Sequence, residues 1–225
     1  RGDDVPSPGG ERVTTQDAVT TWPSREREGR IRTDGRVSFL SDRDGGFDVW
    51  IVDPEGEEAW KVTSEAADVV GHVWSPDGGR LAYVVVGPKG RFLKIADAGG
   101  DVLEEFRLPK SRLRARVVAW VDSEVYLLTG DGLSALDVEE GQRRAVALGG
   151  NSSEEVTAIH ADVRPSDGRV VFVGLADTGT DLWVSDQDGG APERLTTDTL
   201  VQASPCWLGA QRVAGAQDVR GVVAG

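Results

Sequence analysis

Four aspartate-centred turns recur along the chain at nearly constant spacing. Their aspartates lie at positions 34, 77, 122 and 167, so the intervals are 43, 45 and 45 residues. A fifth and weaker copy, Leu208-Gly209-Ala210, follows about one interval later. A period of about 40–50 residues is typical of repeat architectures, in which each repeat is one small structural unit. This period therefore restricts the fold more than any other feature of the sequence.

Each turn lies between two short strands, and two further strands complete the repeat. The strand after the turn alternates, as in Arg80-Leu81-Ala82-Tyr83 and Arg169-Val170-Val171-Phe172, which is typical of a strand with one side against a packed layer. In the first repeat, a third strand is expected at residues 47–53 and ends in Asp. A turn follows it, and a fourth strand is expected at residues 60–63. Four short strands per repeat make one propeller blade. The sequence predicts an all-β propeller of four-stranded antiparallel blades.

The two ends of the chain resemble incomplete repeats. Residues 9–15 are similar to the fourth strand at 189–197, and residues 216–225 are similar to a third strand. We expect the N-terminal strand to complete the C-terminal blade, which leaves no open edge strand. Five blades are then visible, and the alternative is a six-bladed parent. Residues 1–8 are expected to be flexible and residues 9–225 to form one propeller domain.

Three groups of residues carry a resemblance to a known repeat family. They are Trp74-Ser75-Pro76-Asp77-Gly78, Ser41-Asp42-Arg43-Asp44-Gly45 before Asp48-Val49-Trp50, and Glu193-Arg194-Leu195-Thr196. These units resemble the WD-like Pro-Asp repeats of TolB-type β-propellers, over roughly residues 9–225. The third repeat departs from the pattern because it lacks the Pro-Asp-Gly turn.

The resemblance implies a mostly bacterial and often periplasmic or otherwise extracytoplasmic domain. In that family the blades occur as protein-binding modules, as sensor parts of membrane-anchored kinases and as gating domains of serine peptidases. No TolB-like α/β domain precedes the repeats here, so a role in the Tol–Pal system is not supported. The same blades serve very different proteins, so the resemblance specifies the fold more closely than the function.

Composition narrows the class of partner. The net charge is −13, which disfavours nucleic-acid backbones and anionic membrane surfaces. No stretch of 18 or more apolar residues exists, so we expect no membrane insertion. Cys206 is the only cysteine, so no intrachain disulfide forms. We expect a monomer with a protein or peptide partner and no cofactor.

Catalytic motifs are missing from the sequence. The sequence contains no Gly-x-Ser-x-Gly motif, which marks the nucleophile of many serine hydrolases. Residues 132–136 match it except at the last position, where Leu replaces Gly, and they lie on an expected strand. We therefore predict no catalytic residue and a binding or scaffolding role. The alternatives are a sensor or gating propeller of a larger Ser/Thr kinase or serine peptidase, and a propeller that binds a small ligand or carbohydrate.

The only two histidines, His72 and His160, fall on first strands, which in propellers run nearest the central channel. His160 and Asp162 are two residues apart, so they are expected to face the same side and to line the channel mouth. The alternative is a hydrogen-bonded histidine between blades. Arg112 and Arg114 are further binding candidates, in the segment that joins the second and third repeats.

Two basic runs contrast with the acidic whole. The first is expected in a solvated loop of the first repeat, and the second joins two repeats. Because these loops are of different types, we expect them on opposite faces of the propeller. The residues are Arg25, Arg27, Arg30 and Arg32 in the first run and Lys110, Arg112, Arg114 and Arg116 in the second.

Asp42, Asp44 and Asp48 bracket one turn and are weak candidates for calcium ligands. Their spacing does not match an EF-hand loop, and Asp is also a residue that tight turns favour. We therefore predict no metal site. The tryptophans at repeat-equivalent positions are expected to pack between blades.

Overall fold

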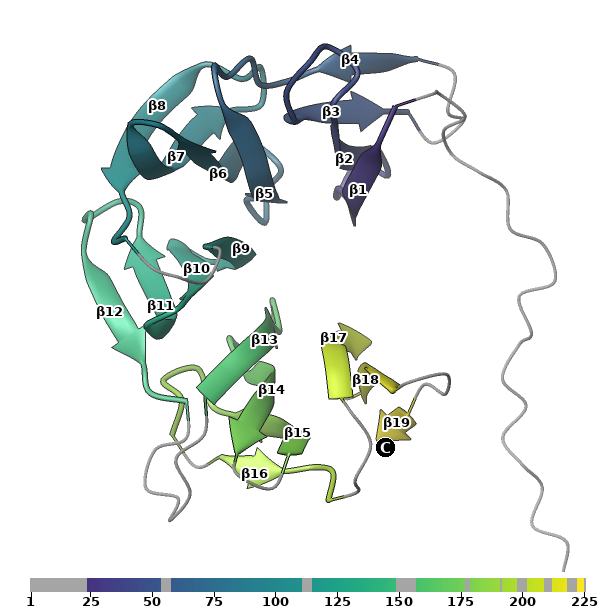
Figure 1. Cartoon of the computed structure of the whole chain (residues 1–225), viewed down its shortest axis with the longest axis vertical. Coiled ribbons are helices and arrows are strands. Elements are labelled where there is room, and N and C mark those ends of the chain that lie inside the picture. The colour runs from purple at the N-terminus through teal and green to yellow at the C-terminus, as the bar shows by residue number, and fades with distance from the viewer. Residues whose placement is uncertain are drawn as a thin grey trace, which may run out of the picture.

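A computed structural model of the chain describes residues 24–53, 58–110, 115–148, 157–176, 179–190, 192–197, 202–208, 212–217 and 222–224. These residues form five antiparallel sheets that follow one another around an axis (Figure 1), and each is called a blade. Blades 1–4 have four strands and blade 5 has three, always paired in chain order. The predicted all-β propeller fold is confirmed.

The first strand of each blade lies nearest the axis, and later strands lie further out (Figure 1). Blade 1 comprises β1 (Glu26–Ile31), β2 (Val37–Ser41), β3 (Asp48–Val52) and β4 (Ala59–Lys61). Blade 2 comprises β5 (Asp68–Trp74), β6 (Arg80–Gly87), β7 (Gly90–Asp97) and β8 (Val102–Arg107). Blade 3 comprises β9 (Arg116–Val121), β10 (Glu124–Thr129), β11 (Gly132–Asp137) and β12 (Arg143–Val146).

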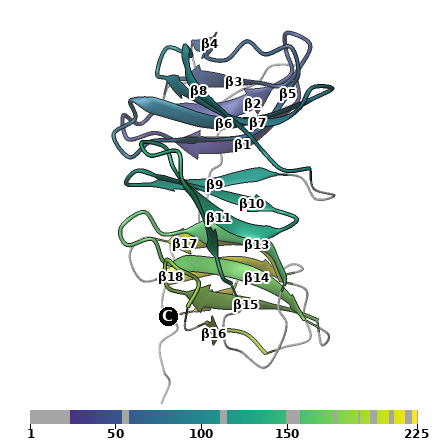
Figure 2. The same cartoon turned by 90° about the vertical axis from the view of Figure 1, so that its left-hand side faces the viewer.

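Blade 4 comprises β13 (Thr157–Val163), β14 (Val170–Ala176), β15 (Gly179–Ser185) and β16 (Glu193–Arg194). Blade 5 comprises β17 (Gln202–Leu208), β18 (Arg212–Gln217) and β19 (Val222–Ala224). Seen from the side, the twisted sheets of blades 1–4 succeed one another along the molecule (Figure 2). The strand that was expected to complete blade 5, at residues 9–15, lies outside the described residues, as does the segment 1–8.

The recurring turns share a left-handed backbone residue. Gly35, Gly78 and Gly168 have φ values of 83°, 71° and 70°. In the third repeat, which lacks this glycine, Asp122 adopts a φ of 49° instead. Asp tolerates this region because its short side chain bonds nearby backbone groups. The turn is thus retained where the Pro-Asp-Gly pattern is lost.

Both faces of the sheets in blades 2–4 are buried, which differs from the one-sided packing that the alternation predicted. In β6, Leu81 and Tyr83 pack in a cluster with blade 1, whereas Ala82 and Val84 pack in a cluster with blade 3. Neighbouring blades cover both sides of each sheet, so its two sets of alternating side chains are both apolar. The core consists of layers between blades rather than one central mass.

Arginine–tryptophan stacking recurs at the blade junctions. In each case the guanidinium of one blade lies over the indole at the end of the next blade's first strand, an arrangement that favours cation–π attraction. The pairs are Arg32 and Trp74 at 3.9 Å, Arg80 and Trp120 at 5.2 Å, and Arg164 and Trp207 at 4.5 Å from the ring centroid. The predicted packing of these tryptophans between blades is confirmed.

Blade 1 has one face that packs against no other blade in the described chain. Phe39, Trp50 and Val52 form a cluster of their own on this face. The Arg43 guanidinium lies over the Trp50 ring at 4.3 Å, and the Lys61 ammonium lies 6.0 Å from it. Long cationic side chains therefore cover the aromatic rings of this face.

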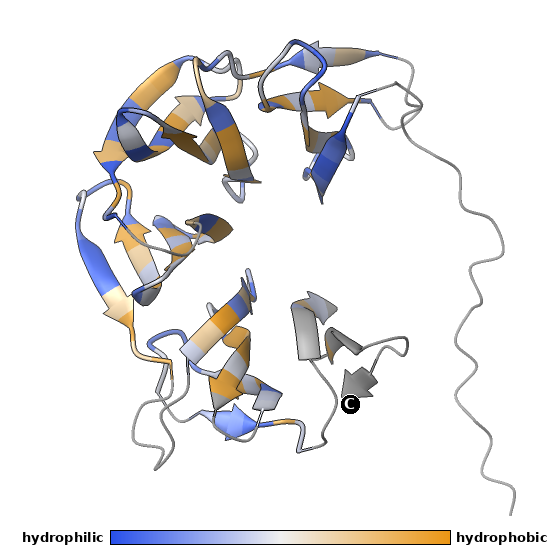
Figure 3. Ribbon diagram, in the orientation of Figure 1, coloured by the Kyte–Doolittle hydropathy of each residue, from blue (hydrophilic) through white to orange (hydrophobic). Residues whose placement is uncertain are grey.

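The charged segment before Asp34 is a strand and a turn, not the expected solvated loop. Residues 26–31 form β1, the innermost strand of blade 1, which Figure 3 colours as hydrophilic along most of its length. A polar sequence is compatible with this strand because part of it faces the axis instead of a neighbouring blade. Among the described residues, no helix is long and apolar enough to cross a membrane.

Candidate binding site on the propeller axis

Every first strand departs from regular pairing near the axis. The shifts lie between Arg27 and Arg30 in β1, Val69 and Gly71 in β5, Ala158 and His160 in β13, Ala203 and Cys206 in β17, and in β9 opposite Tyr126 and Leu127. Bulges of this kind turn side chains away from their regular direction and are frequent beside functional sites. Here they surround a common space.

Two cavities occupy this space. One has a volume of about 320 Å³ and is lined by residues of β1, β9, β13 and β17, among them Arg30 and Asp162. The other has a volume of about 600 Å³ and is bounded by β1, β5, β9 and β13. Glu28, Arg116 and His160 line both. Cavities of this size are typical of small-molecule or peptide sites.

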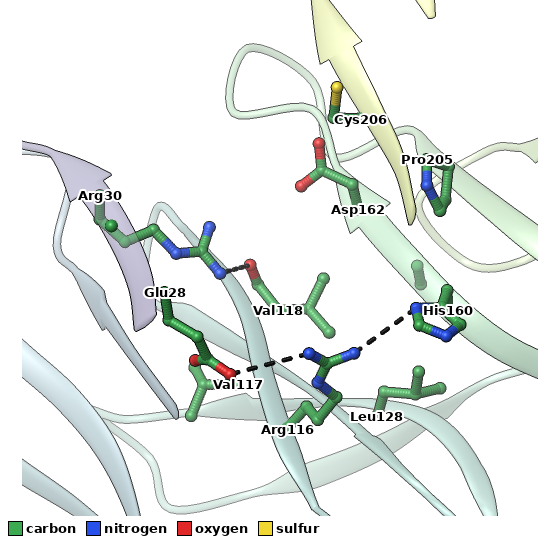
Figure 4. Close-up of a pocket in the computed structure, with 12 residues that line it drawn as sticks. Glu28, Arg30, Arg116, Val117, Val118, Leu128, His160, Asp162, Pro205 and Cys206 are labelled. Atoms are coloured by element: carbon green, nitrogen blue, oxygen red, sulfur yellow. Dashed lines mark hydrogen bonds and ion pairs between the residues drawn. The ribbon is translucent and has the colours of Figure 1, made fainter. Parts of the chain in front are cut away.

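Arg116 links the walls of the two cavities (Figure 4). Its Nη2 lies 3.7 Å from Oε1 of Glu28, and its Nη1 lies 3.5 Å from Nδ1 of His160. Because Arg can only donate, Nδ1 accepts, and the neutral imidazole carries its proton on Nε2. Burial and, second, the Arg116 charge lower the pKa of His160, so the ring is neutral at pH 7.

Glu28 and Arg30 bring the polar part of β1 to the same space. Glu28 has a φ of 56°, an uncommon conformation for a residue other than glycine, and sits inside the β1 bulge. Nη2 of Arg30 donates to the Val118 carbonyl oxygen at 3.5 Å (Figure 4). Backbone strain of this type persists where the surrounding structure maintains it and clusters at binding sites.

Asp162 forms part of the opposite wall. Its Oδ2 accepts a hydrogen bond of 2.9 Å from the backbone N–H of Trp207, and Oδ1 accepts one of 3.0 Å from Val163. Burial raises the pKa of this carboxyl group, and these hydrogen bonds oppose the rise. His160 and Asp162 therefore line one cavity, as their spacing predicted, while Asp162 also joins blades 4 and 5.

His72 lies between blades 1 and 2 and does not contribute to either cavity. Its side chain is fully buried, and its Nε2 is 2.8 Å from Oγ of Ser38. Ser38 also accepts a hydrogen bond of 2.9 Å from Nε1 of Trp74. The expectation that His72 lines the channel mouth is wrong, and the alternative of a hydrogen-bonded histidine between blades is confirmed for His72, because its position in β5 directs it into that layer.

Parts of the two basic runs lie near the same axial space instead of on opposite faces. Arg27 and Arg30 of β1 line the same cavities as Arg116 of β9. The expectation of opposite faces assumed that the first run was a loop, whereas its central residues form an innermost strand. Arg112 and Arg114, the other binding candidates in the second run, lie outside the described residues.

The acidic turn of blade 1 engages cationic side chains. Oδ2 of Asp42 lies 2.6 Å from Nε of Arg25, and both Asp44 and Asp48 form ion pairs with Lys61, at 3.6 and 2.9 Å. Hydrogen bonds from Arg25 lower the pKa of Asp42. In the described part of the chain, no group of three or more His, Cys, Asp or Glu residues is arranged to hold a metal ion.

Sequence reasoning did not select Glu28, Arg30 or Arg116 as site residues. Strand pairing makes Arg116 and His160 equivalent, because Arg116 pairs with Leu128 and His160 pairs with Val173, four residues after Glu124 and Arg169 respectively. The sequence alone hides this equivalence, because Arg116 lies eight residues before Glu124 whereas His160 lies nine residues before Arg169. No pattern in the sequence indicates Glu28 as a site residue, because the direction of its side chain depends on the bulge in β1.

Comparisons with known proteins agree with this architecture. No family model matches the chain. Over 49 residues, or 22% of this chain, it is 41% identical to the Tol-Pal system protein TolB of Dechloromonas aromatica (strain RCB). The match spans only 12% of the length of that protein.

Solved structures share the fold at low sequence identity. A puromycin-hydrolysing peptidase of Mycobacterium tuberculosis gives a TM-score of 0.66 at 14% identity, over 89% of this chain and 35% of that one. The β-propeller domain of the Trilobed protease from Pyrococcus furiosus, described as having an open velcro topology, gives 0.56 at 15% identity, over 88% and 83%. The repeats and the structure together show a β-propeller, and the short TolB match supports its likeness to TolB-type propellers.

Proposed function

We propose that this propeller is a non-catalytic binding module that holds a protein or peptide partner at its axis. The observation that carries the proposal is a cavity at the axis that is lined by the polar side chains of Glu28, Arg116 and His160. The bulged first strands of four blades surround this cavity. A rigid scaffold that presents side chains from several repeats to one cavity is suited to binding. TolB, the matched relative, is by name part of the Tol-Pal system.

The arrangement of nucleophile and base candidates supports a non-catalytic role. Cys206, His160 and Asp162 all line one cavity. However, His160 contacts Arg116, and Asp162 accepts from backbone N–H groups. Nucleophilic catalysis requires the nucleophile and its base within hydrogen-bond reach of each other, and no such contact joins Cys206 to His160 in the described structure.

The test is affinity capture with the immobilised chain from an extract of the source cells, followed by mass spectrometry. Arg116→Gln serves as the site variant and Arg169→Gln as the control, because Arg169 is exposed and lies outside both cavities. We expect a specific protein that the wild type and the control retain and the site variant loses. Equal retention by all three proteins would exclude the axis as the binding site.

A gating role within a larger hydrolase is the second candidate. It is favoured by the structural similarity to a peptidase, of which this chain spans 35%. The discriminating experiment compares peptide hydrolysis by the full-length gene product with that of a version lacking the repeats. Loss of selectivity for short over long peptides would support gating, and absence of hydrolysis by the full-length product would reject it.

We further propose that the protein works outside the cytoplasm, as the resemblance to TolB-type repeats implies. Fractionation of the source bacterium with an antibody against the chain tests this. Recovery in the periplasmic or membrane-associated fraction is expected, and recovery with cytoplasmic markers would contradict it.

A further inference from the structure

The guanidinium groups at the axis have N–H donors that make no short hydrogen bond. Nη2 of Arg27 and Nη2 of Arg30 each reach one backbone carbonyl oxygen at 3.5 Å, and Arg116 contacts Glu28 at 3.7 Å. Elsewhere in the molecule, Arg25 and Arg144 approach carboxylates to 2.6 Å. An arginine has five N–H donors. The long contacts of Arg30 and Arg116 therefore leave several of their donors without a strong acceptor beside the cavities, whereas the Arg27 guanidinium lies over the Phe47 ring at 3.8 Å.

These donors come from separate blades: Arg30 and Arg116 line the smaller cavity, and Arg27 and Arg116 line the larger one. Arg27 and Arg30 belong to blade 1 and Arg116 to blade 3, and all three line the axial cavities. His160 of blade 4 adds an Nε2–H donor, because Arg116 occupies its Nδ1. A local excess of cationic donors in a chain with net charge −13 creates a field that attracts an anion to the axis.

The acidic side chains nearby limit the charge that the site can accept. Glu28 and Asp162 line the same space, and Asp162 is already bonded to two backbone N–H groups. A dianion such as phosphate would be repelled by these carboxylates. A single carboxylate needs less charge compensation, and its two oxygens match the forked geometry of a guanidinium.

The remaining walls are apolar. Val70, Leu128 and Ile159 line the larger cavity beside the arginines. Its volume of about 600 Å³ exceeds what a lone carboxylate fills and suits a short attached chain with an apolar side chain. The cavity thus combines an anion site with space for a few residues of peptide.

We propose that Arg30, Arg116 and His160 bind a peptide carboxylate in the smaller axial cavity, and that the adjoining residue extends past Leu128, which lines both cavities, toward Val70 in the larger one. This inference rests on the proposed peptide-binding function and specifies its chemistry. The carboxylate belongs either to a C-terminus or to an Asp or Glu side chain, and both sources present the same planar monoanion.

The test uses three peptide probes, titrated into isotope-labelled protein and followed by NMR chemical shifts. The probes are N-acetyl-alanyl-alanyl-leucine, its C-terminal amide, and N-acetyl-alanyl-glutamyl-leucine amide. We expect the free acid to bind at least ten-fold more tightly than the alanyl amide, with shifts at Arg30, Arg116 and His160. Preference for the glutamyl amide over the alanyl amide, without preference for the free acid, would assign the site to side-chain carboxylates.

Substitutions test whether Arg30 and Arg116 cause the preference for the free acid over the amide. Arg30→Gln and Arg116→Gln should each abolish the difference between acid and amide, and Arg116→Lys should retain part of it because the charge remains. Arg169→Gln should behave as wild type, and circular dichroism should show that every variant is folded. Equal binding of all three peptides, or binding of none at 10 mM, would overturn the proposal, as would tighter binding of inorganic phosphate.

These outcomes are separable from those of the proposed function. If the capture experiment yields a partner that Arg116→Gln loses while no peptide acid binds, the binding function stands and the carboxylate chemistry is wrong. If the peptide acid binds but no partner is captured, the site chemistry stands and the partner proposal fails.

Discussion

His72 and His160 lie on first strands two blades apart, yet they occupy different environments. His72 pairs with Tyr83 and is fully buried between blades. His160 pairs with Val173, and in blade 2 the equivalent residue is Gly71. A side chain added at Gly71 would meet Oε2 of Glu28 at 3.4 Å, so that position also faces the axis. A difference of one position separates a structural histidine from one that lines a cavity.

The chemical states of the two rings differ accordingly. Ser38 Oγ accepts from Trp74 and donates to the Arg30 carbonyl oxygen at 3.4 Å, so it accepts from Nε2–H of His72. Nδ1 of His72 is then an unprotonated atom, buried and without a partner. Burial and, second, the Arg30 charge lower the pKa of His72 to about 3. A second proton on this ring would have neither water nor an acceptor to stabilise it.

The largest expected effect is on folding. His72→Ala removes a fully buried ring and its hydrogen bond, so we expect a loss of about 3 kcal/mol in the free energy of unfolding. Urea unfolding monitored by tryptophan fluorescence measures this. A loss below about 0.5 kcal/mol would show that His72 is not the structural member of the pair.

The pH dependence of stability sharpens the same contrast. His72 has its pKa lowered from 6.5 to about 3, so the unfolded chain binds more protons between these values. The free energy of unfolding therefore has its full value above pH 6.5. It falls as the pH decreases, by up to about 1.4 kcal/mol per pH unit. Urea unfolding from pH 7 to pH 5 should show about 2 kcal/mol of loss. His72→Gln should flatten this slope, whereas His160→Gln should keep the larger part of it.

Ser38 tests the hydrogen-bond network around His72. Ser38→Ala leaves Nε2 of His72 and Nε1 of Trp74 without their acceptor, so we expect a loss of about 1.5 kcal/mol. The double variant with His72→Ala should be less destabilised than the sum of the single variants, by about 1 kcal/mol. Strict additivity in urea unfolding would contradict a direct coupling.

His160→Ala should have the smallest effect on stability. The ring lines both cavities and makes one contact of 3.5 Å, so we expect a change within about 0.5 kcal/mol. The same variant should weaken peptide binding, as measured by the NMR titration. Destabilisation comparable to that of His72→Ala would remove the distinction between the two histidines.

The repeat made most of the fold predictable. Aspartate turns at 34, 77, 122 and 167 recur because blades 1–4 each have a left-handed residue between their first two strands. The proximity of His160 and Asp162 followed from their spacing on one strand. Their location at the axis followed from the position of that strand in a blade.

Other features depended on contacts that no local pattern reports. The sequence Glu-Arg-Glu-Gly-Arg-Ile has neither helical nor strand periodicity, and it forms β1 because β2 offers it a pairing edge. The direction of His72 depends on the bulge before Gly71, which shifts the alternation by one residue. The positions of Arg27 and Arg30 beside cavities that Arg116 also lines depend on the arrangement of blades 1 and 3 around one axis.

The covered aromatic face of blade 1 has a consequence for behaviour at high concentration. Trp50 and Phe39 lie beneath the Arg43 guanidinium, and Lys61 adds a second charge above Trp50. Arg43 pairs with Glu26, and Lys61 pairs with Asp44 and Asp48, so a layer of ion pairs covers the rings and opposes apolar contact with another molecule. Replacing Arg43 and Lys61 with alanine would uncover the aromatic rings and promote self-association in concentrated solution.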